Sequence, residues 1–143
     1  MDKLIWDKYF SLVEEIKQSI MDKCPFEEFS IGEFYMLRLL MDYEKRNVNV
    51  TTKLISEYLR ISKPAVSQML NALEKKELIE RTINREDRRQ ICITTTRKGR
   101  DLVIEQCKKH EELFSEIIKS VDEKDIETLF VILENVLKAV KEV

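Results

Sequence analysis

Hydrophobic residues recur at three- and four-residue steps along most of this chain, which predicts amphipathic helices. The first such segment covers residues 3–22, and Pro25 ends it. A second helix is expected to open at Ser30, because Glu33 three residues later completes a capping box. The charged stretch 42–49 ends that helix. The pattern therefore predicts an amphipathic N-terminal helix followed by a core helix.

Two short helices are predicted next, separated by very few residues. Thr51 or Thr52 can cap the first, and Ser62 can cap the second, where Pro64 falls in the first turn and its missing N–H costs nothing. Only residues 59–61 lie between the two apolar patterns, so the helices must cross sharply. This spacing is typical of a helix-turn-helix.

After Glu77 the pattern changes from helical to roughly alternating. Residues 78–83 and 90–94 are short and rich in β-branched side chains, and the charged loop 84–89 separates them. The three segments together predict a β-hairpin with a long tip. The fold class expected is mainly α with a small β-hairpin wing.

Two further helices are predicted after the hairpin, a long one capped by Thr96 and a final one that starts at Asp122. Val131 and Ile132 make the final helix apolar on more than one face, so that one face needs a partner. We therefore expect a homodimer formed by the terminal helices. The expected organisation is a single domain, residues 1–143, with dimerisation helices at 1–29 and 101–143 and a winged helix-turn-helix at 30–100.

The amino-acid composition limits the classes of function that this chain can have. A chain of 143 residues with 43% apolar and 36% charged residues is expected to be one soluble domain, and its three lone cysteines suit a reducing cytoplasm. Only 2 glycines, 2 prolines and 1 histidine are present, which leaves little material for a Gly-rich phosphate loop, a nucleophilic triad or a closed metal site. Neither an enzyme nor a cofactor is expected, and no apolar run is long enough to span a membrane. An enzyme would require a convergent pocket around His110 or Cys24.

The charge is concentrated in the middle of the chain. The whole chain has a net charge of −2, but residues 51–100 carry 12 basic and 6 acidic side chains, a net charge of +6. Residues 1–50 are net −3 and residues 101–143 net −5. A basic centre between acidic ends indicates a module that meets a polyanion, although chance clustering of solvated lysines and arginines gives the same count.

The predicted second helix of the helix-turn-helix has a polar outward face that suits base reading. Gln and Asn side chains can bond bidentately to adenine, and Lys63 can reach guanine or phosphate. Ser62 is first a helix cap, whereas nothing in the sequence gives Ser67, Gln68 or Asn71 a structural role. The expected DNA-binding residues of this helix are Ser62, Lys63, Pro64, Ser67, Gln68 and Asn71.

The hairpin tip is expected to contact DNA as a wing. Asp87 and Arg89 can pair across the bend, which leaves Arg85 and Arg88 to reach outward. A solvated loop is the alternative. Further phosphate contacts are expected from residues near the two flanking helix starts, namely Thr52, Lys53, Arg97 and Lys98.

Three stretches, residues 62–67, 73–81 and 85–100, resemble the MarR family of bacterial transcriptional regulators. The Asp87-x-Arg89 pattern followed by Thr-x-Lys-Gly is the most specific part. The resemblance implies a homodimer with two winged helices on a pseudo-palindromic operator, often with a small-molecule or redox input. It also implies that Arg89 enters the minor groove.

The sequence departs from the family pattern in three places. Glu77 stands where the family usually has a helix-ending glycine, so Lys76 or Glu77 is expected in a strained conformation. Thr95 replaces a usual leucine, and Arg97 a frequent acidic residue. None of these departures falls among the DNA-binding residues expected in the helix-turn-helix or at the wing tip.

A ligand pocket, if formed, is expected between the dimer helices and the winged helix. Arg38 is a candidate anchor for an acidic aromatic compound, although aromatic residues at helical spacing are more often core. The candidate pocket residues are Trp6, Tyr9, Phe34, Tyr35, Arg38, Tyr58 and His110.

Of the three cysteines, Cys24, Cys92 and Cys107, only Cys24 is a candidate redox residue. The peroxide-sensing branch of the family carries its reactive cysteine near the position of Tyr9, where this chain has none. Cys107 and His110 have ligand-like spacing, but one histidine does not suffice to predict a metal site. The sequence thus predicts a dimeric, sequence-specific DNA-binding repressor released by a small molecule or, less readily, a redox signal. The alternative is a winged-helix protein-interaction module.

Overall fold

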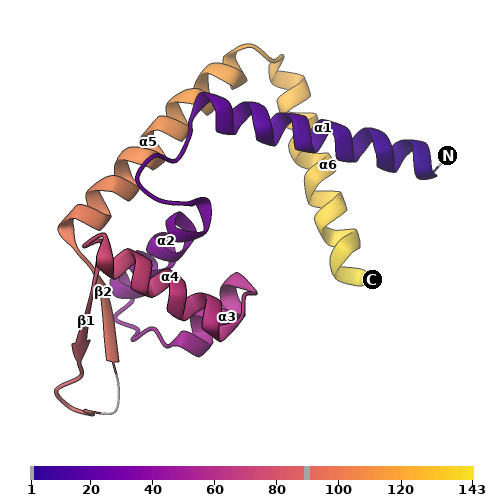
Figure 1. The fold of residues 1–143 in the computed structure, drawn as a ribbon. Coiled ribbons are helices and arrows are strands. Elements are labelled where there is room, and N and C mark those ends of the chain that lie inside the picture. Colours follow the sequence, from indigo (N-terminus) through magenta and orange to yellow (C-terminus); the bar gives the residue numbers. More distant parts are fainter. Residues whose placement is uncertain (1, 89–90) are drawn as a thin grey trace. The chain divides into compact units, whose positions relative to one another are not determined.

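The computed structural model describes residues 2–88 and 91–143 and is mainly helical, with one β-hairpin (Figure 1). The predicted fold class is confirmed. The chain divides into two compact units, with the boundary between Cys107 and Lys108. The elements in chain order are α1 (Asp2–Lys23), α2 (Ile31–Lys45), α3 (Thr52–Leu59), α4 (Lys63–Lys75), β1 (Ile79–Ile83), β2 (Ile91–Thr95), α5 (Arg97–Lys119) and α6 (Glu123–Glu142).

Helix starts fall where the polar caps predicted them. Ser30 and Glu33 form a complete capping box at α2. Thr51, rather than Thr52, caps α3 by accepting a hydrogen bond from the backbone N–H of Leu54. Ser62 caps α4 with Pro64 in its first turn. These local side-chain acceptors satisfy backbone donors that no helix can pair internally, so they position each start.

The core of the first unit is built on α2. Met36, Leu37 and Leu40 of this helix are fully buried. Buried apolar residues of the next elements join the same cluster, among them Ile55, Val66, Leu73, Leu78 and Ile79. This core holds the helix-turn-helix and the base of the hairpin as one body, from which the hairpin tip extends (Figure 1).

The turn from α4 into β1 has the strained residue that the sequence predicted. Glu77 has a φ of 62°, in the left-handed region. Its N–H donates to the carbonyl of Glu74, and the N–H of Leu78 donates to that of Leu73. This is the Schellman pattern, in which glycine normally occupies the left-handed position. Leu73 and Leu78 are both buried, so the contact that accompanies the motif offsets the strain.

The two strands pair antiparallel, with Ile79 opposite Thr95 and Ile83 opposite Ile91. At the base of the hairpin, next to the core, Ile79 and Ile93 are buried. Ile83 and Ile91, toward the tip, are exposed. The hairpin is therefore anchored at one end and projects into solvent at the other.

The terminal helices leave wide apolar surfaces uncovered. Neither α1 nor α6 contains a buried residue. On α6, eight apolar side chains are 48–68% exposed, namely Leu129, Phe130, Val131, Ile132, Leu133, Val136, Leu137 and Val140. On α1 the exposed apolar side chains are Leu4, Ile5, Trp6, Tyr9, Phe10, Leu12, Val13 and Ile16. Within the described residues, no helix has the length and apolar character of a membrane span.

Candidate nucleic-acid interface

The outward face of α4 carries the polar side chains expected to read DNA. Lys63, Pro64, Ser67 and Gln68 are exposed, whereas Val66 and Leu70 face the core. Ser62 is exposed as well, but its hydroxyl oxygen accepts a hydrogen bond from Ala65 N at 3.3 Å. The helix therefore separates a buried apolar side from a solvent-facing polar side near its N-terminus.

Asn71 has a structural partner, contrary to the expectation that it has no structural role. Arg81 of β1 donates from Nη2 to the Oδ1 atom of Asn71 at 2.6 Å. The Nε atom of Arg81 lies 3.5 Å from a carboxylate oxygen of Glu74. One arginine of the wing thus contacts two side chains of α4. Spacing along the chain gave no indication of this contact.

The start of α5 is tied to the end of α4. Lys98 donates from Nζ to the carbonyl of Lys76 at 3.0 Å, and the Thr96 hydroxyl donates to the carbonyl of Glu77 at 2.8 Å. Thr96 also caps α5 by accepting from Gly99 N. Lys98, expected as a phosphate contact, therefore serves as a bridge between two helix ends while its side chain stays exposed. This role accounts for a cation at a helix N-terminus, where the helix dipole disfavours it.

Arg97 and Arg100 in the same turn differ in their surroundings. Arg97 faces solvent and lies 3.7 Å from Asp101 one turn along the helix. Arg100 donates to the carbonyl and the hydroxyl of Thr95 and lies 3.7 Å from Glu44. Arg97 is thus the cation of this turn most available to a phosphate.

Gly99 is required by a close approach of two backbones. A Cβ atom at this position would lie 2.2 Å from the carbonyl oxygen of Leu78. Only glycine lets the first turn of α5 pack directly on the start of β1. The Thr-x-Lys-Gly pattern of the sequence is therefore a packing motif that fixes the base of the wing.

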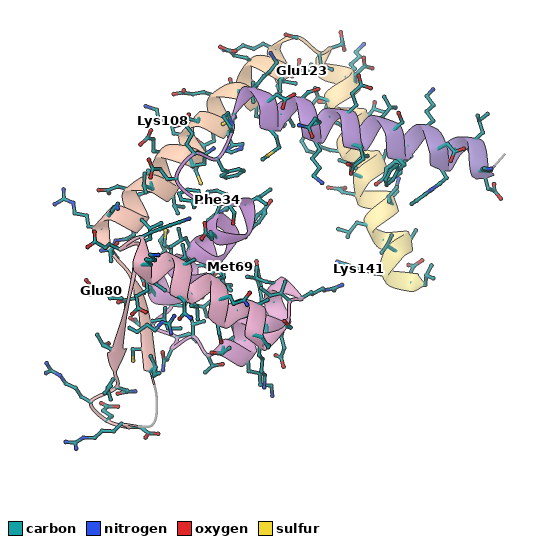
Figure 2. All side chains as sticks on the ribbon, in the orientation of Figure 1. Phe34, Met69, Glu80, Lys108, Glu123 and Lys141 are labelled. Carbon is teal, nitrogen blue, oxygen red and sulfur yellow. The ribbon has the colours of Figure 1, made fainter. Side chains whose placement is uncertain are left out.

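The hairpin tip presents exposed charges. Arg85, Asp87 and Arg88 are all exposed, and Asn84 accepts a hydrogen bond from Glu86 N at 2.9 Å. Side chains that end in nitrogen project outward from the tip in Figure 2. Arg89 lies outside the described residues, so its expected pairing with Asp87 stays a prediction.

Thr52 and Lys53, expected to contact phosphate, begin α3. Thr52 is half-buried and Lys53 is exposed. The Nζ atom of Lys53 lies 3.9 Å from Glu57, a solvent-exposed pair of little energetic weight. Lys53 can therefore exchange this partner for a phosphate at small cost.

The candidate pocket residues fall into separate groups. Phe34 is buried among Phe26 and Phe29, and the guanidinium of Arg38 lies 5.7 Å from the Phe34 ring centroid. Tyr35 is exposed on the same helix. Phe34, which we expected to line a ligand pocket, is therefore a core residue. The guanidinium of Arg38 lies over its ring.

The other pocket candidates lie on other elements. Trp6 and Tyr9 are exposed on α1, with ring centroids 6.1 Å apart. Tyr58 is exposed on α3, and His110 is half-buried in the second unit. A pocket built from the whole set stays a prediction.

Cys24 is buried, with 5% of its surface exposed, and its sulfur accepts a hydrogen bond from Gln106 at 3.5 Å. Cys92 and Cys107 are half-buried. Reactive thiols are usually accessible and in electropositive surroundings, so this setting does not favour a redox role for Cys24. Among the described residues, no three histidine, cysteine or carboxylate side chains gather as metal ligands.

The order of α2, α3, α4, hairpin and α5 defines a winged helix-turn-helix protein. The model of the MarR family matches residues 29–90, the stretch that contains α2 to α4 and the first strand of the wing. The resemblance to this family is confirmed by that match. Among curated proteins, none matches the chain.

Solved structures of bacterial proteins share the fold. MepR, described as a transcription regulator of the Staphylococcus aureus multidrug efflux pump MepA, is 23% identical with a TM-score of 0.75, over 92% of this chain and 95% of that chain. YusO from Bacillus subtilis is 23% identical with a TM-score of 0.74, over 97% and 98%. A MepR variant bound to an oligodeoxyribonucleotide is 24% identical with a TM-score of 0.66, over 94% and 97%.

Proposed function

We propose that this protein is a homodimeric, sequence-specific DNA-binding transcriptional regulator. The observation that carries the proposal is the exposed polar face of α4, with Ser67 and Gln68, beside a basic wing with Arg85 and Arg88. Both belong to the segment of the chain with a net charge of +6. Helix and wing together suit a duplex, since the helix fits the major groove and arginines suit phosphates or the minor groove. The MarR match and the oligonucleotide-bound MepR variant support the proposal.

The dimer is proposed from the uncovered apolar faces of α1 and α6. Apolar surface of this extent is rarely left in water by a monomeric protein. A second copy is the partner that a regulator of a two-fold symmetric operator needs. We therefore assign residues 1–29 and 101–143 to dimerisation and residues 30–100 to DNA binding, in one functional domain.

Repression with release by a small molecule is the mode of regulation we propose. One MepR structure is described as bound to ethidium bromide, which supports a small-molecule input for this fold. In this chain Tyr35 and Arg38 offer an exposed aromatic ring and a cation on α2, next to the core that supports α4. A ligand that shifts α2 would act both on α4, the proposed recognition helix, and on the β-hairpin that forms the wing.

The test is selection of duplexes from a randomised pool by the full-length protein, followed by sequencing of the bound fraction. A regulator of this class enriches a pseudo-palindromic motif. The alternative is a protein-interaction module, whose basic hairpin binds an acidic protein and enriches no sequence. A pool that stays random after repeated rounds would overturn the proposed function.

A further inference from the structure

The hairpin carries a pair of exposed apolar side chains near its tip. Ile83 of β1 lies directly opposite Ile91 of β2, and the two residues are 68% and 56% exposed. Residues directly opposite each other in an antiparallel pair project from the same face of the sheet, with Cβ atoms about 5 Å apart. The structure therefore places two branched hydrocarbon side chains next to each other in solvent, at the end of the wing away from the core.

This pair continues the face of the hairpin that contacts the rest of the protein. Alternate residues of a strand share a face, so Ile79, Arg81 and Ile83 project to the same side. Ile79 is buried in the core, and Arg81 donates a hydrogen bond to Asn71 of α4. Beyond Arg81 the apolar residues of this face continue, but the core does not cover them. Ile83 and Ile91 thus extend, toward the tip, the surface on which the wing meets α4.

Basic side chains lie on both sides of the pair along the hairpin. Arg81 comes two residues before Ile83, and exposed Arg85 and Arg88 belong to the loop between the strands. A standard protein–protein interface needs roughly 20–30 residues on each side, and two isoleucines are far fewer. The surface instead suits a polyanion that has small apolar areas between its charges.

Double-stranded DNA has this chemistry at its minor groove. The phosphates follow the edges of the groove, and the carbon atoms of the deoxyribose rings form its walls. Proteins that enter this groove combine arginines with apolar side chains, isoleucine among them. The charged tip and the apolar pair of the wing match these two features of the groove.

We propose that Ile83 and Ile91 are a DNA-contacting site, which packs on deoxyribose rings of the minor groove while Arg85 and Arg88 bind the neighbouring phosphates. This inference rests on the proposed function, because it assigns a second kind of contact to the same interface. The apolar contact adds affinity that depends little on salt, since it releases no counterions from the phosphates. It adds no sequence preference, because every nucleotide carries the same sugar.

The experiment compares the wild-type protein with the double variant Ile83→Thr/Ile91→Thr. Threonine keeps the β-branched shape that favours a strand, but it replaces hydrocarbon with a hydroxyl group. Anisotropy titrations against the duplex enriched by selection, at several salt concentrations, give the affinity and its salt slope. The double variant is expected to bind roughly tenfold more weakly, with an unchanged slope and an unchanged enriched motif.

A second readout follows the buried apolar surface directly. Calorimetric titrations at several temperatures give the heat-capacity change of binding, which is more negative when more apolar surface is buried. This change should be less negative for the double variant. Thr82→Ile is the matched control, because it adds an isoleucine on the opposite face of β1, where Thr82 pairs with Cys92. It should leave the affinity, the slope and the heat-capacity change as they are in the wild-type protein.

The outcomes separate this inference from the proposed function. A wild-type protein that enriches no motif overturns the proposed function. An enriched motif that the double variant binds with wild-type affinity or wild-type heat-capacity change overturns the apolar contact alone, and is expected if an acidic protein covers the pair. A smaller salt slope in the double variant also overturns it, because the pair then only holds the arginines of the tip in place. Tighter binding by Thr82→Ile overturns it too, since the effect then does not depend on the face.

Discussion

The Glu44 carboxylate at the end of α2 accepts hydrogen bonds from both the backbone N–H and the hydroxyl of Thr95 in β2. Thr95 stands where the family usually has leucine, and its hydroxyl is buried with this partner. Arg100 lies 3.7 Å from the same carboxylate and donates to Thr95 as well. The core helix, the wing and the start of α5 are thus joined at one charged group.

Glu44→Gln should destabilise the protein by about 1.5–3 kcal/mol, since hydrogen bonds to a charged acceptor are the stronger kind and Arg100 loses its counter-charge. The measurement is the free energy of unfolding in urea at fixed protein concentration. Asp42→Asn on the same helix is the control, because it removes only an exposed pair with Arg46. Equal effects of the two substitutions would contradict the role of Glu44.

Gly99→Ala should destabilise the fold by about 1–3 kcal/mol or more, because its Cβ meets the backbone carbonyl of Leu78, which cannot move alone. Gly32→Ala provides the matched control. The new Cβ there would lie 3.1 Å from the flexible end of Met69, so thermal unfolding should change far less. A Gly99→Ala protein with an unaltered melting temperature would show that α5 does not pack on β1 in this way.

Glu77→Gly should stabilise the protein by about 1 kcal/mol, because the left-handed conformation that strains a glutamate suits glycine. Lys76→Gly, one residue earlier at a φ of −79°, should be destabilising instead. Urea unfolding of both variants checks the opposite signs. Destabilisation by Glu77→Gly would mean that its side chain contributes more than the strain costs.

Replacing Arg85 and Arg88 by alanine should weaken binding to all duplexes. It should also reduce the slope of log affinity against log salt concentration, by about one for each phosphate that the wing no longer neutralises. Anisotropy titrations at several salt concentrations give this slope. Lys138→Ala on α6 removes a cation outside the proposed interface and should leave the slope unchanged. An unchanged slope in the double variant would remove the wing tip from the interface.

Deletion of residues 122–143 should abolish both dimerisation and operator binding, since α6 carries eight uncovered apolar side chains that need a partner. Sedimentation equilibrium gives the oligomeric state, and an anisotropy titration gives the affinity. A truncated protein that remains a dimer and binds tightly would defeat the assignment of this helix.

Local signals predicted most of the fold. Caps such as Ser30 and Ser62 and the change of hydrophobic period after Glu77 placed the helix starts and the hairpin within a residue or two, because both depend on neighbours in sequence. Contacts between distant side chains were not predictable in this way. The contact between Asn71 and Arg81 and the contact between Lys98 and the Lys76 carbonyl both depend on how the elements pack against one another. The spacing of residues along the chain does not predict that packing.

Sequence-specific regulation requires that this protein bind one DNA sequence in preference to others. The most direct measurement is an anisotropy titration of the full-length protein, in physiological salt, against the DNA upstream of its own gene, the duplex enriched by selection and a scrambled duplex of equal length. We expect tight, salt-dependent binding to the enriched duplex and weak binding to the scrambled one; tight binding to the upstream DNA as well would make the regulator self-controlling. Equal, weak binding to all three duplexes would contradict sequence-specific regulation and leave only the attraction of a basic surface for a polyanion.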